Sequence, residues 1–130
     1  MLLDVKSVDK KFNGVYALKG LDFSLGEGEV HGLIGENGAG KSTFIKILGG
    51  VYKRDGGSIL WNGKDLPEVI RPEESRKLGI NIIFQDNVLI PAFTGMENSC
   101  LGRPYPVKGG LIQWKEMEQE TEAKAAELGI

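Results

Sequence analysis

The chain has 130 residues, a net charge of −2 and a pI near 5.5, which fit one modest domain and exclude a broadly basic nucleic-acid-binding surface. Its single cysteine, Cys100, excludes an internal disulfide and suits a reducing compartment. No apolar run approaches the roughly 18 residues of a membrane span, and the charges close to Met1 argue against a signal peptide.

The first 25 residues predict an antiparallel β layer. Residues 2–9 alternate loosely between apolar and polar side chains and residues 21–25 alternate cleanly, so both are expected to be strands. An Asn-Gly turn is expected at residues 13–14. Two aromatic residues lie close to this turn, Phe12 and Tyr16. From residue type alone, each ring either packs on the β layer or stacks on a nucleotide base.

A phosphate-binding loop is the strongest motif in the chain. Residues 35–43 fit the pattern G-x-x-x-x-G-K-[ST], between an apolar strand predicted at 30–34 and a helix predicted at 41–48. The helix would point its positive end at the phosphates of a nucleoside triphosphate. Lys41 is expected to reach the outer phosphates, and Ser42 to ligate Mg²⁺. The expected nucleotide-binding residues of the loop are Gly35, Glu36, Asn37, Gly38, Ala39, Gly40, Lys41, Ser42 and Thr43.

Further elements are predicted after this helix. An Asn-Gly hairpin is expected at residues 62–63, a short helix at 71–79, a buried apolar strand at 80–84, and a capping box at 94–97 that begins another helix. A mainly apolar stripe at helical spacing predicts the packing face of a last helix; its members are Trp114, Met117, Thr121, Ala125 and Leu128.

The residues after strand 80–84 leave two interpretations open. An enzyme that hydrolyses a nucleotide held in a phosphate-binding loop needs an acidic residue at the end of a second strand, which holds Mg²⁺ and orients the attacking water. The strand is followed by Gln85 and Asp86, so it ends either in an acidic metal site formed by Asp86 or in a loop whose Gln85 contacts Mg²⁺ or the attacking water. No further strand is predicted, so the catalytic apparatus of the chain is expected to be incomplete.

Nearly the whole chain resembles the ATP-binding cassette (ABC) ATPases that drive membrane transport. The resemblance rests first on residues 12–18 and 28–43. Phe12 lies 29 residues before Lys41 (41 − 12), where the family has its adenine-stacking aromatic, with Tyr16 as the alternative. Gln85 lies 44 residues beyond Lys41 (85 − 41), where the family has its glutamine loop, which favours the loop over the acidic strand end.

The resemblance implies the fold and its extent. The expected fold is α/β, a P-loop NTPase core with an antiparallel β layer, truncated before the helical signature region. Residues 1–130 would be the N-terminal portion of one nucleotide-binding domain, without the signature, the second acidic motif (Walker B) or the switch histidine. Residues 109–113 contain two glycines and a glutamine but do not match the signature.

Within the family, the chain is most similar to bacterial importers of simple sugars, of the ribose, galactose, arabinose and xylose type. The chain departs from that branch in two places. Around the loop glutamine, Phe84 stands where the branch often has histidine, and Asp86 and Asn87 stand where it has acid-rich residues. Gln113 replaces a common aspartate. The similarity rests on residues 46–52, 89–91, 97–98, 101–103 and 110–114.

The same resemblance implies ATP and Mg²⁺ as cofactors. Phe12 would stack the adenine, residues 35–43 would hold the phosphates, Ser42 and Gln85 would ligate Mg²⁺, and Lys41 and Gln85 would be catalytic. The implied function is the ATP-binding part of an ATPase subunit that powers sugar import.

The implied partners are a membrane permease, a second ABC cassette and, indirectly, a sugar-binding protein, at the cytoplasmic face of the bacterial cell membrane. No nucleic acid is expected. Two alternatives stay open: a nucleotide-binding fragment without activity of its own, which is the expectation for the 130 residues alone, and part of a soluble ABC protein acting on nucleic acid.

Two reactive side chains are expected to be structural, His31 ahead of the loop and Cys100 at a helix end. A parallel sheet without its later strands would expose an apolar edge, so self-association is also expected.

Overall fold

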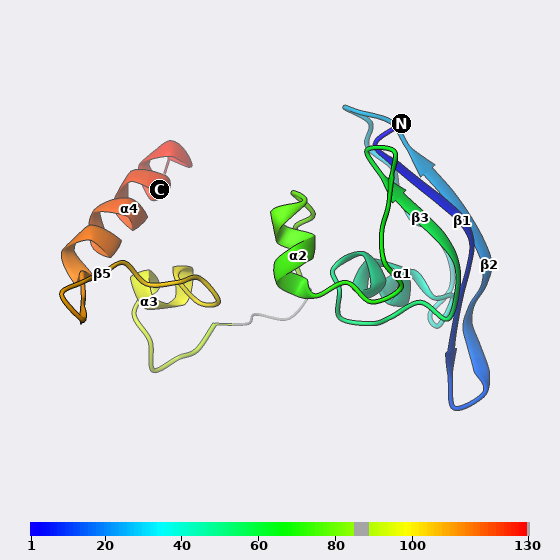
Figure 1. Ribbon diagram of the computed structural model, residues 1–130, viewed down its shortest axis with the longest axis horizontal. Coiled ribbons are helices and arrows are strands. Elements are labelled where there is room, and N and C mark those ends of the chain that lie inside the picture. Colours follow the sequence, from blue (N-terminus) through cyan, green and yellow to red (C-terminus); the bar gives the residue numbers. More distant parts are fainter. Residues whose placement is uncertain (85–88, 130) are drawn as a thin grey trace. The chain divides into compact units, whose positions relative to one another are not determined.

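The computed structural model describes residues 1–84 and 89–129, which form two compact units, Met1–Ile83 and Phe84–Ile130. The first unit contains a four-stranded sheet and two helices, and the second contains two helices and a small hairpin (Figure 1). Among the described helices, none is long and apolar enough to cross a membrane.

The sheet of the first unit is antiparallel throughout the described strands, in the order β2-β1-β3-β4. The bounds of its strands are β1 (Leu3–Phe12), β2 (Val15–Leu25), β3 (Gly56–Trp61) and β4 (Lys64–Asp65). The predicted antiparallel β layer is therefore confirmed, and its first two strands form one long hairpin.

Both Asn-Gly hairpins predicted from the sequence are present. Asn13 and Gly14 have φ angles of 49° and 82°, and Asn62 and Gly63 have φ angles of 49° and 74°. Two successive positive φ values are required by a type I′ turn, whose twist matches that of the flanking strands. Asparagine and glycine adopt this conformation at the lowest cost, which explains why the pattern predicted both turns.

Helix α1 (Lys41–Leu48) is the helix predicted after the phosphate-binding loop, and it lies against one face of the sheet (Figure 1). It buries Phe44 and Ile47, which are 2% and 3% exposed. Burial of side chains of this size contributes about 1.5–3 kcal/mol each, so the helix is firmly anchored. The buried core consists of Leu3, Val5, Val8, Leu18, Phe44, Ile47, Ile59, Leu66 and Ile70.

Helix α2 (Pro72–Lys77) is the short helix predicted at 71–79. Proline in its first turn and acidic residues before basic ones suit the helix dipole. The hydroxyl of the buried Ser75 donates a hydrogen bond of 2.7 Å to the carbonyl oxygen of Leu48, the last residue of α1. This bond joins the two helices of the first unit.

The strands predicted at 30–34 and 80–84 are wrong for this structure, because neither segment pairs in a described sheet. Val30 and Ile34 are each 98% exposed, and Ile83 is 99% exposed. A run of apolar residues indicates a preference for burial, but a strand also needs a neighbouring strand to pair its N–H and C=O groups. The described residues supply no such neighbour for either run.

The second unit contains α3 (Gly95–Ser99), a hairpin of β5 (Val107–Lys108) and β6 (Leu111–Ile112), and α4 (Trp114–Glu127). The predicted capping box is confirmed: the N–H of Glu97 donates to the Thr94 hydroxyl at 3.2 Å, and the N–H of Thr94 donates to the Glu97 carboxylate at 2.8 Å.

The predicted stripe on α4 is only partly buried. Met117 is 1% exposed, whereas Trp114 and Leu128 are 49% and 76% exposed. Thr121, also on the stripe, has its hydroxyl 3.3 Å from that of Ser99 on α3. The middle of the stripe therefore packs, and its two ends remain at the surface of the unit.

Candidate functional site

The phosphate-binding loop leads directly into α1, and its glycines have the backbone that only glycine adopts readily. Gly38 and Gly40 have φ angles of 88° and 84°. Gly40 is the N-cap of α1 and has no side chain to cap the first turn, so the first N–H groups of the helix are not shielded by it. A loop of this kind forms a concave cradle of N–H groups that suits an anion.

Gly40 also lies so close to β2 that a side chain at this position would not fit. A Cβ atom at this position would collide with the carbonyl oxygen of Ala17 and with Cδ2 of Leu18, both on β2. The glycine therefore has two functions, since it allows the left-handed turn and lets the loop approach the sheet. This close approach fixes the start of α1 against β2.

Lys41 closes the loop from the helix side. Its Nζ donates hydrogen bonds to the carbonyl oxygens of Gly35 at 2.6 Å and Glu36 at 2.8 Å. The loop is tightened further by the N–H of Ala39, which donates to the Glu36 carbonyl at 3.1 Å. The ammonium thus lies beside the loop, where it would balance phosphate charge.

The next two residues of the motif begin the helix. Ser42 is exposed on the first turn of α1, and Thr43 is half-buried. Hydroxyl oxygens are hard ligands of the kind that Mg²⁺ prefers, so an exposed Ser42 beside the loop is suited to that role. In the described ranges, no group of three His, Cys, Asp or Glu side chains could hold a metal ion.

Phe12 and Tyr16, the two candidates for base stacking, lie on opposite sides of the β1–β2 turn and are 40% and 44% exposed. The Phe12 ring meets the ring of Tyr52 edge-on, with centroids 5.1 Å apart, and Tyr52 follows α1 closely. The Nζ of Lys46 on α1 lies 5.5 Å from the Tyr52 ring centroid. Phe12 is thereby linked to the helix that carries the phosphate-binding loop.

Tyr16 has a different environment. Its ring has the Nζ of Lys11 at 4.3 Å and that of Lys19 at 5.6 Å from its centroid. Both ammonium groups lie within the range of a cation–π contact. The pKa of Lys11 is raised, chiefly by a side-chain hydrogen bond with Tyr16. Phe12 is thus the aromatic more directly connected to α1, and Tyr16 is the one more surrounded by charge.

Gln85, predicted to be a Mg²⁺ ligand and a catalytic residue, lies outside the described residues, as does Asp86. The remaining predicted site residues come from the first unit: the loop, the start of α1 and the β1–β2 hairpin.

His31 and Cys100 both make local contacts. The Nε2 of His31 lies 3.1 Å from the Glu29 carboxylate, and its ring lies edge-on to Phe23 at 5.6 Å. The Glu29 carboxylate also accepts the N–H of Gly26, which is the main reason that the pKa of Glu29 is lowered. Cys100 is the C-cap of α3. The structural roles expected of both residues stay a prediction.

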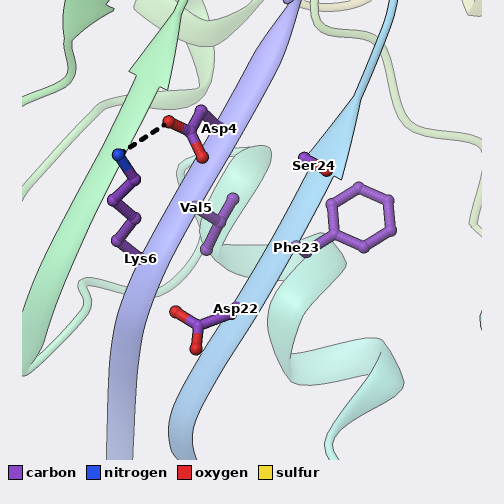
Figure 2. Close-up of a pocket in the computed structure, with 6 residues that line it drawn as sticks. All are labelled: Asp4, Val5, Lys6, Asp22, Phe23 and Ser24. Atoms are coloured by element: carbon purple, nitrogen blue, oxygen red, sulfur yellow. Dashed lines mark ion pairs between the residues drawn. The ribbon is translucent and has the colours of Figure 1, made fainter.

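A hollow of about 500 Å³ lies over β1 and β2 and is lined by residues of these two strands (Figure 2). Asp4 and Lys6 pair across its edge at 3.1 Å, and the Asp22 carboxylate accepts the N–H of Ser7 at 2.7 Å. Asp4, Lys6 and Asp22 are therefore already engaged within the sheet, and no predicted site residue lines the hollow.

Sequence reasoning missed three residues around Phe12. Lys10, Tyr52 and Asp55 contact the ring or support its strand. Tyr52 and Asp55 come from the segment after α1, so only the folded chain brings them to Phe12. No motif in the sequence marked them.

Comparison with known proteins agrees with this geometry. Residues 18–130 match the sequence profile of the family described as "ABC transporter". The chain is 45% identical over 130 residues to the ribose import ATP-binding protein RbsA of Geobacillus kaustophilus, and 47% identical over 129 residues to RbsA 1 of Rubrobacter xylanophilus. Each match covers 99% of this chain but only 26% of the relative, so the chain spans about a quarter of the length of these relatives.

Solved structures give the same result. A nucleotide-free ATP-binding cassette from an ABC transporter matches 92% of this chain with a TM-score of 0.70 and 29% identity; the match covers 46% of that cassette. A dimeric cassette bound to ADP and phosphate matches 93% of this chain with a TM-score of 0.67 and 26% identity, over 54% of that protein. The sequence profile, the curated relatives and the fold agree, and the chain belongs to the ABC transporter family of ATP-binding cassettes.

Proposed function

We propose that residues 1–130 form the N-terminal portion of a nucleotide-binding domain, in an ATPase subunit that powers sugar import. The observation that carries the proposal is the closed phosphate-binding loop, in which Lys41 donates to the carbonyl oxygens of Gly35 and Glu36. The relatives named as ribose import proteins support the transport role and make ribose the first sugar to test.

The residues fit MgATP in distinct ways. The loop and the start of α1 offer N–H groups and one ammonium to the phosphates, and Phe12 offers an exposed aromatic surface to the adenine. Ser42, with Gln85, would complete the coordination of Mg²⁺, which would neutralise phosphate charge during transfer to water. Lys41 would hold the outer phosphates in place while negative charge shifts between their oxygens.

The proposed partners are those of an importer. The subunit would lie peripherally at the cytoplasmic face of the bacterial membrane and contact a permease, with residues 85–103 as the contact region. A second cassette, in the same or another chain, would complete the nucleotide site, and a sugar-binding protein would act indirectly. One solved cassette with this fold is dimeric, which supports the pairing.

The experiment compares Lys41→Ala with Lys64→Ala in the intact protein. Lys64 is an exposed lysine on β4, so its variant is a matched loss of one surface charge. Removal of Lys41 eliminates a charge-assisted contact worth about 1.5–3 kcal/mol, so MgATP affinity should fall roughly tenfold to a hundredfold. Calorimetry gives the affinity, and phosphate release gives the turnover, which should be lost.

Three outcomes would replace the proposal. Unchanged affinity and turnover in Lys41→Ala would remove the nucleotide assignment. Binding by the intact protein without any turnover would indicate a nucleotide-binding module. A salt-sensitive complex with RNA or DNA would indicate a soluble ABC protein acting on nucleic acid.

A further inference from the structure

The ammonium of Lys10 lies close to the ring of Phe12. Its Nζ lies 5.2 Å from the ring centroid, within the range of a cation–π contact. Lys10 is only 6% exposed, whereas Phe12 is 40% exposed. The ring therefore has a buried cation at one side and still offers surface to solvent.

A buried cation requires a partner, and Asp55 supplies it. The Asp55 carboxylate lies 3.1 Å from the Lys10 Nζ through Oδ1. Without this anion, Lys10 would be an uncompensated charge and would have to move toward water. The position of the ammonium near Phe12 thus depends on a residue 45 positions away along the chain.

The second oxygen of Asp55 fixes the backbone next to Phe12. Its Oδ2 accepts the N–H of Lys11 at 2.7 Å, and the N–H of Asp55 donates to the carbonyl oxygen of Asp9 at 2.9 Å. The pairing of β1 with β3 reaches Asp9 and Gly56, so Lys11 lies beyond the end of that ladder. The carboxylate takes the place of a strand partner there.

The strand needs this support because its other ladder is irregular at the same point. The pairing of β1 with β2 shifts register between Lys10 and Lys11, one residue before Phe12. The N–H of Lys11 and the ammonium of Lys10 both draw the pKa of Asp55 below its usual value, the N–H being the larger cause. The carboxylate is therefore charged across the neutral range.

We propose that Asp55 is a positioning residue for nucleotide binding, which holds Lys10 and the Lys11 backbone so that Phe12 presents a fixed face to the base. The inference rests on the proposed stacking of the base on Phe12. A purely structural ion pair would stabilise the fold without affecting recognition of the base. The two roles differ in what they predict for a ligand that has phosphates but no base.

The experiment uses two probes on the intact protein, MgATP and magnesium tripolyphosphate. Asp55→Ala should weaken MgATP binding about threefold to tenfold and leave tripolyphosphate binding unchanged. Asp4→Ala is the matched control, because Asp4 also lies 3.1 Å from a lysine and its side chain is 30% exposed, as is that of Asp55. This control should change neither dissociation constant.

A double-mutant cycle tests whether Asp55 acts through the ring. In the Phe12→Ala background, Asp55→Ala should cause no further loss of MgATP affinity. If Asp55→Ala folds poorly, Asp55→Asn takes its place in the cycle. The ratio of the two dissociation constants remains informative for a partly folded sample, since unfolded protein binds neither probe.

The outcomes separate this inference from the proposed function. Equal weakening of both probes by Asp55→Ala, or the same loss of MgATP affinity with and without Phe12, overturns the positioning role. If Phe12→Ala leaves the ratio of the MgATP and tripolyphosphate dissociation constants unchanged, base stacking on Phe12 is overturned, and this inference with it. Unchanged tripolyphosphate binding in Lys41→Ala overturns the proposed phosphate site, whichever result Asp55 gives.

Discussion

Gly40 joins the phosphate-binding loop to the sheet, and both its conformation and its surroundings require glycine. Its φ is 84°, and a Cβ would collide with Ala17 and Leu18. A left-handed alanine costs about 1–2 kcal/mol, and overpacking adds about 1–3 kcal/mol. We expect Gly40→Ala to lower the free energy of unfolding by about 2–5 kcal/mol in urea denaturation without nucleotide.

Gly79 gives the control for this prediction. Its φ is 87°, close to that of Gly40, but a Cβ there meets nothing within 4 Å. Gly79→Ala should therefore cost only the backbone part, about 1–2 kcal/mol. Equal losses in the two variants would show that the approach of the loop to β2 does not restrict the side chain at position 40.

The sequence predicts some parts of the site better than others. The phosphate-binding loop is marked by residue types at fixed positions. Glycine stands where φ is positive, and lysine follows at a fixed spacing. The surroundings of Phe12 are not local. Tyr52 and Asp55 meet β1 only after the chain has passed through α1, so no spacing rule along the sequence could identify them.

Helix α3 depends on a capping box whose strength varies with pH. Hydrogen bonds from the N–H and hydroxyl of Thr94, the N–H first, lower the pKa of Glu97 below its usual 4.5. A group with a lowered pKa in the folded state contributes its stability above the unfolded pKa. That contribution is therefore complete above pH 4.5 and is lost as the pH falls through the lowered folded value.

The prediction is checked by NMR titration of the Glu97 carboxyl group and by the amide signals of α3. The carboxyl midpoint should lie below 4.5, and the α3 amides should shift with the same midpoint. In Glu97→Gln, the α3 amides should no longer follow this titration, because the amide side chain at position 97 does not ionise in this pH range. A midpoint at or above 4.5 would mean that the Thr94 bonds do not persist in solution.

Elements with local signals were predicted more reliably than those that depend on distant partners. The Asn-Gly turns and the Thr94 cap are fixed by adjacent residues, and the structure has them where they were expected. The strands at 30–34 and 80–84 were inferred from apolar composition alone. An apolar composition indicates that a segment tends to be buried, but it does not identify the neighbouring segment that buries it.

At the scale of the whole chain, three members of the same two apolar runs lie at the surface of the first unit. Val30 and Ile34 are each 98% exposed, and Ile83 is 99% exposed. Large exposed apolar side chains favour contact with another molecule. Val30 and Ile34 also precede the phosphate-binding loop directly, so self-association would take place next to the candidate site.

We therefore expect the 130-residue chain to self-associate in a concentration-dependent way, as the sequence also predicted. Sedimentation velocity over a range of concentrations measures this. The double variant Val30→Lys and Ile34→Lys should weaken association at least about tenfold, since each side chain removed from an apolar contact is worth about 1.5–3 kcal/mol.

Val69→Lys provides the comparison, because Val69 is also an exposed valine, at 60%, and lies outside both apolar runs. It adds a positive charge as each change in the double variant does, so a general effect of charge on solubility would appear in this variant as well. Association that persists in Val69→Lys and weakens in the double variant would locate the contact at residues 30–34. A chain that stays monomeric at every concentration would show that exposure of these side chains is not sufficient to drive association.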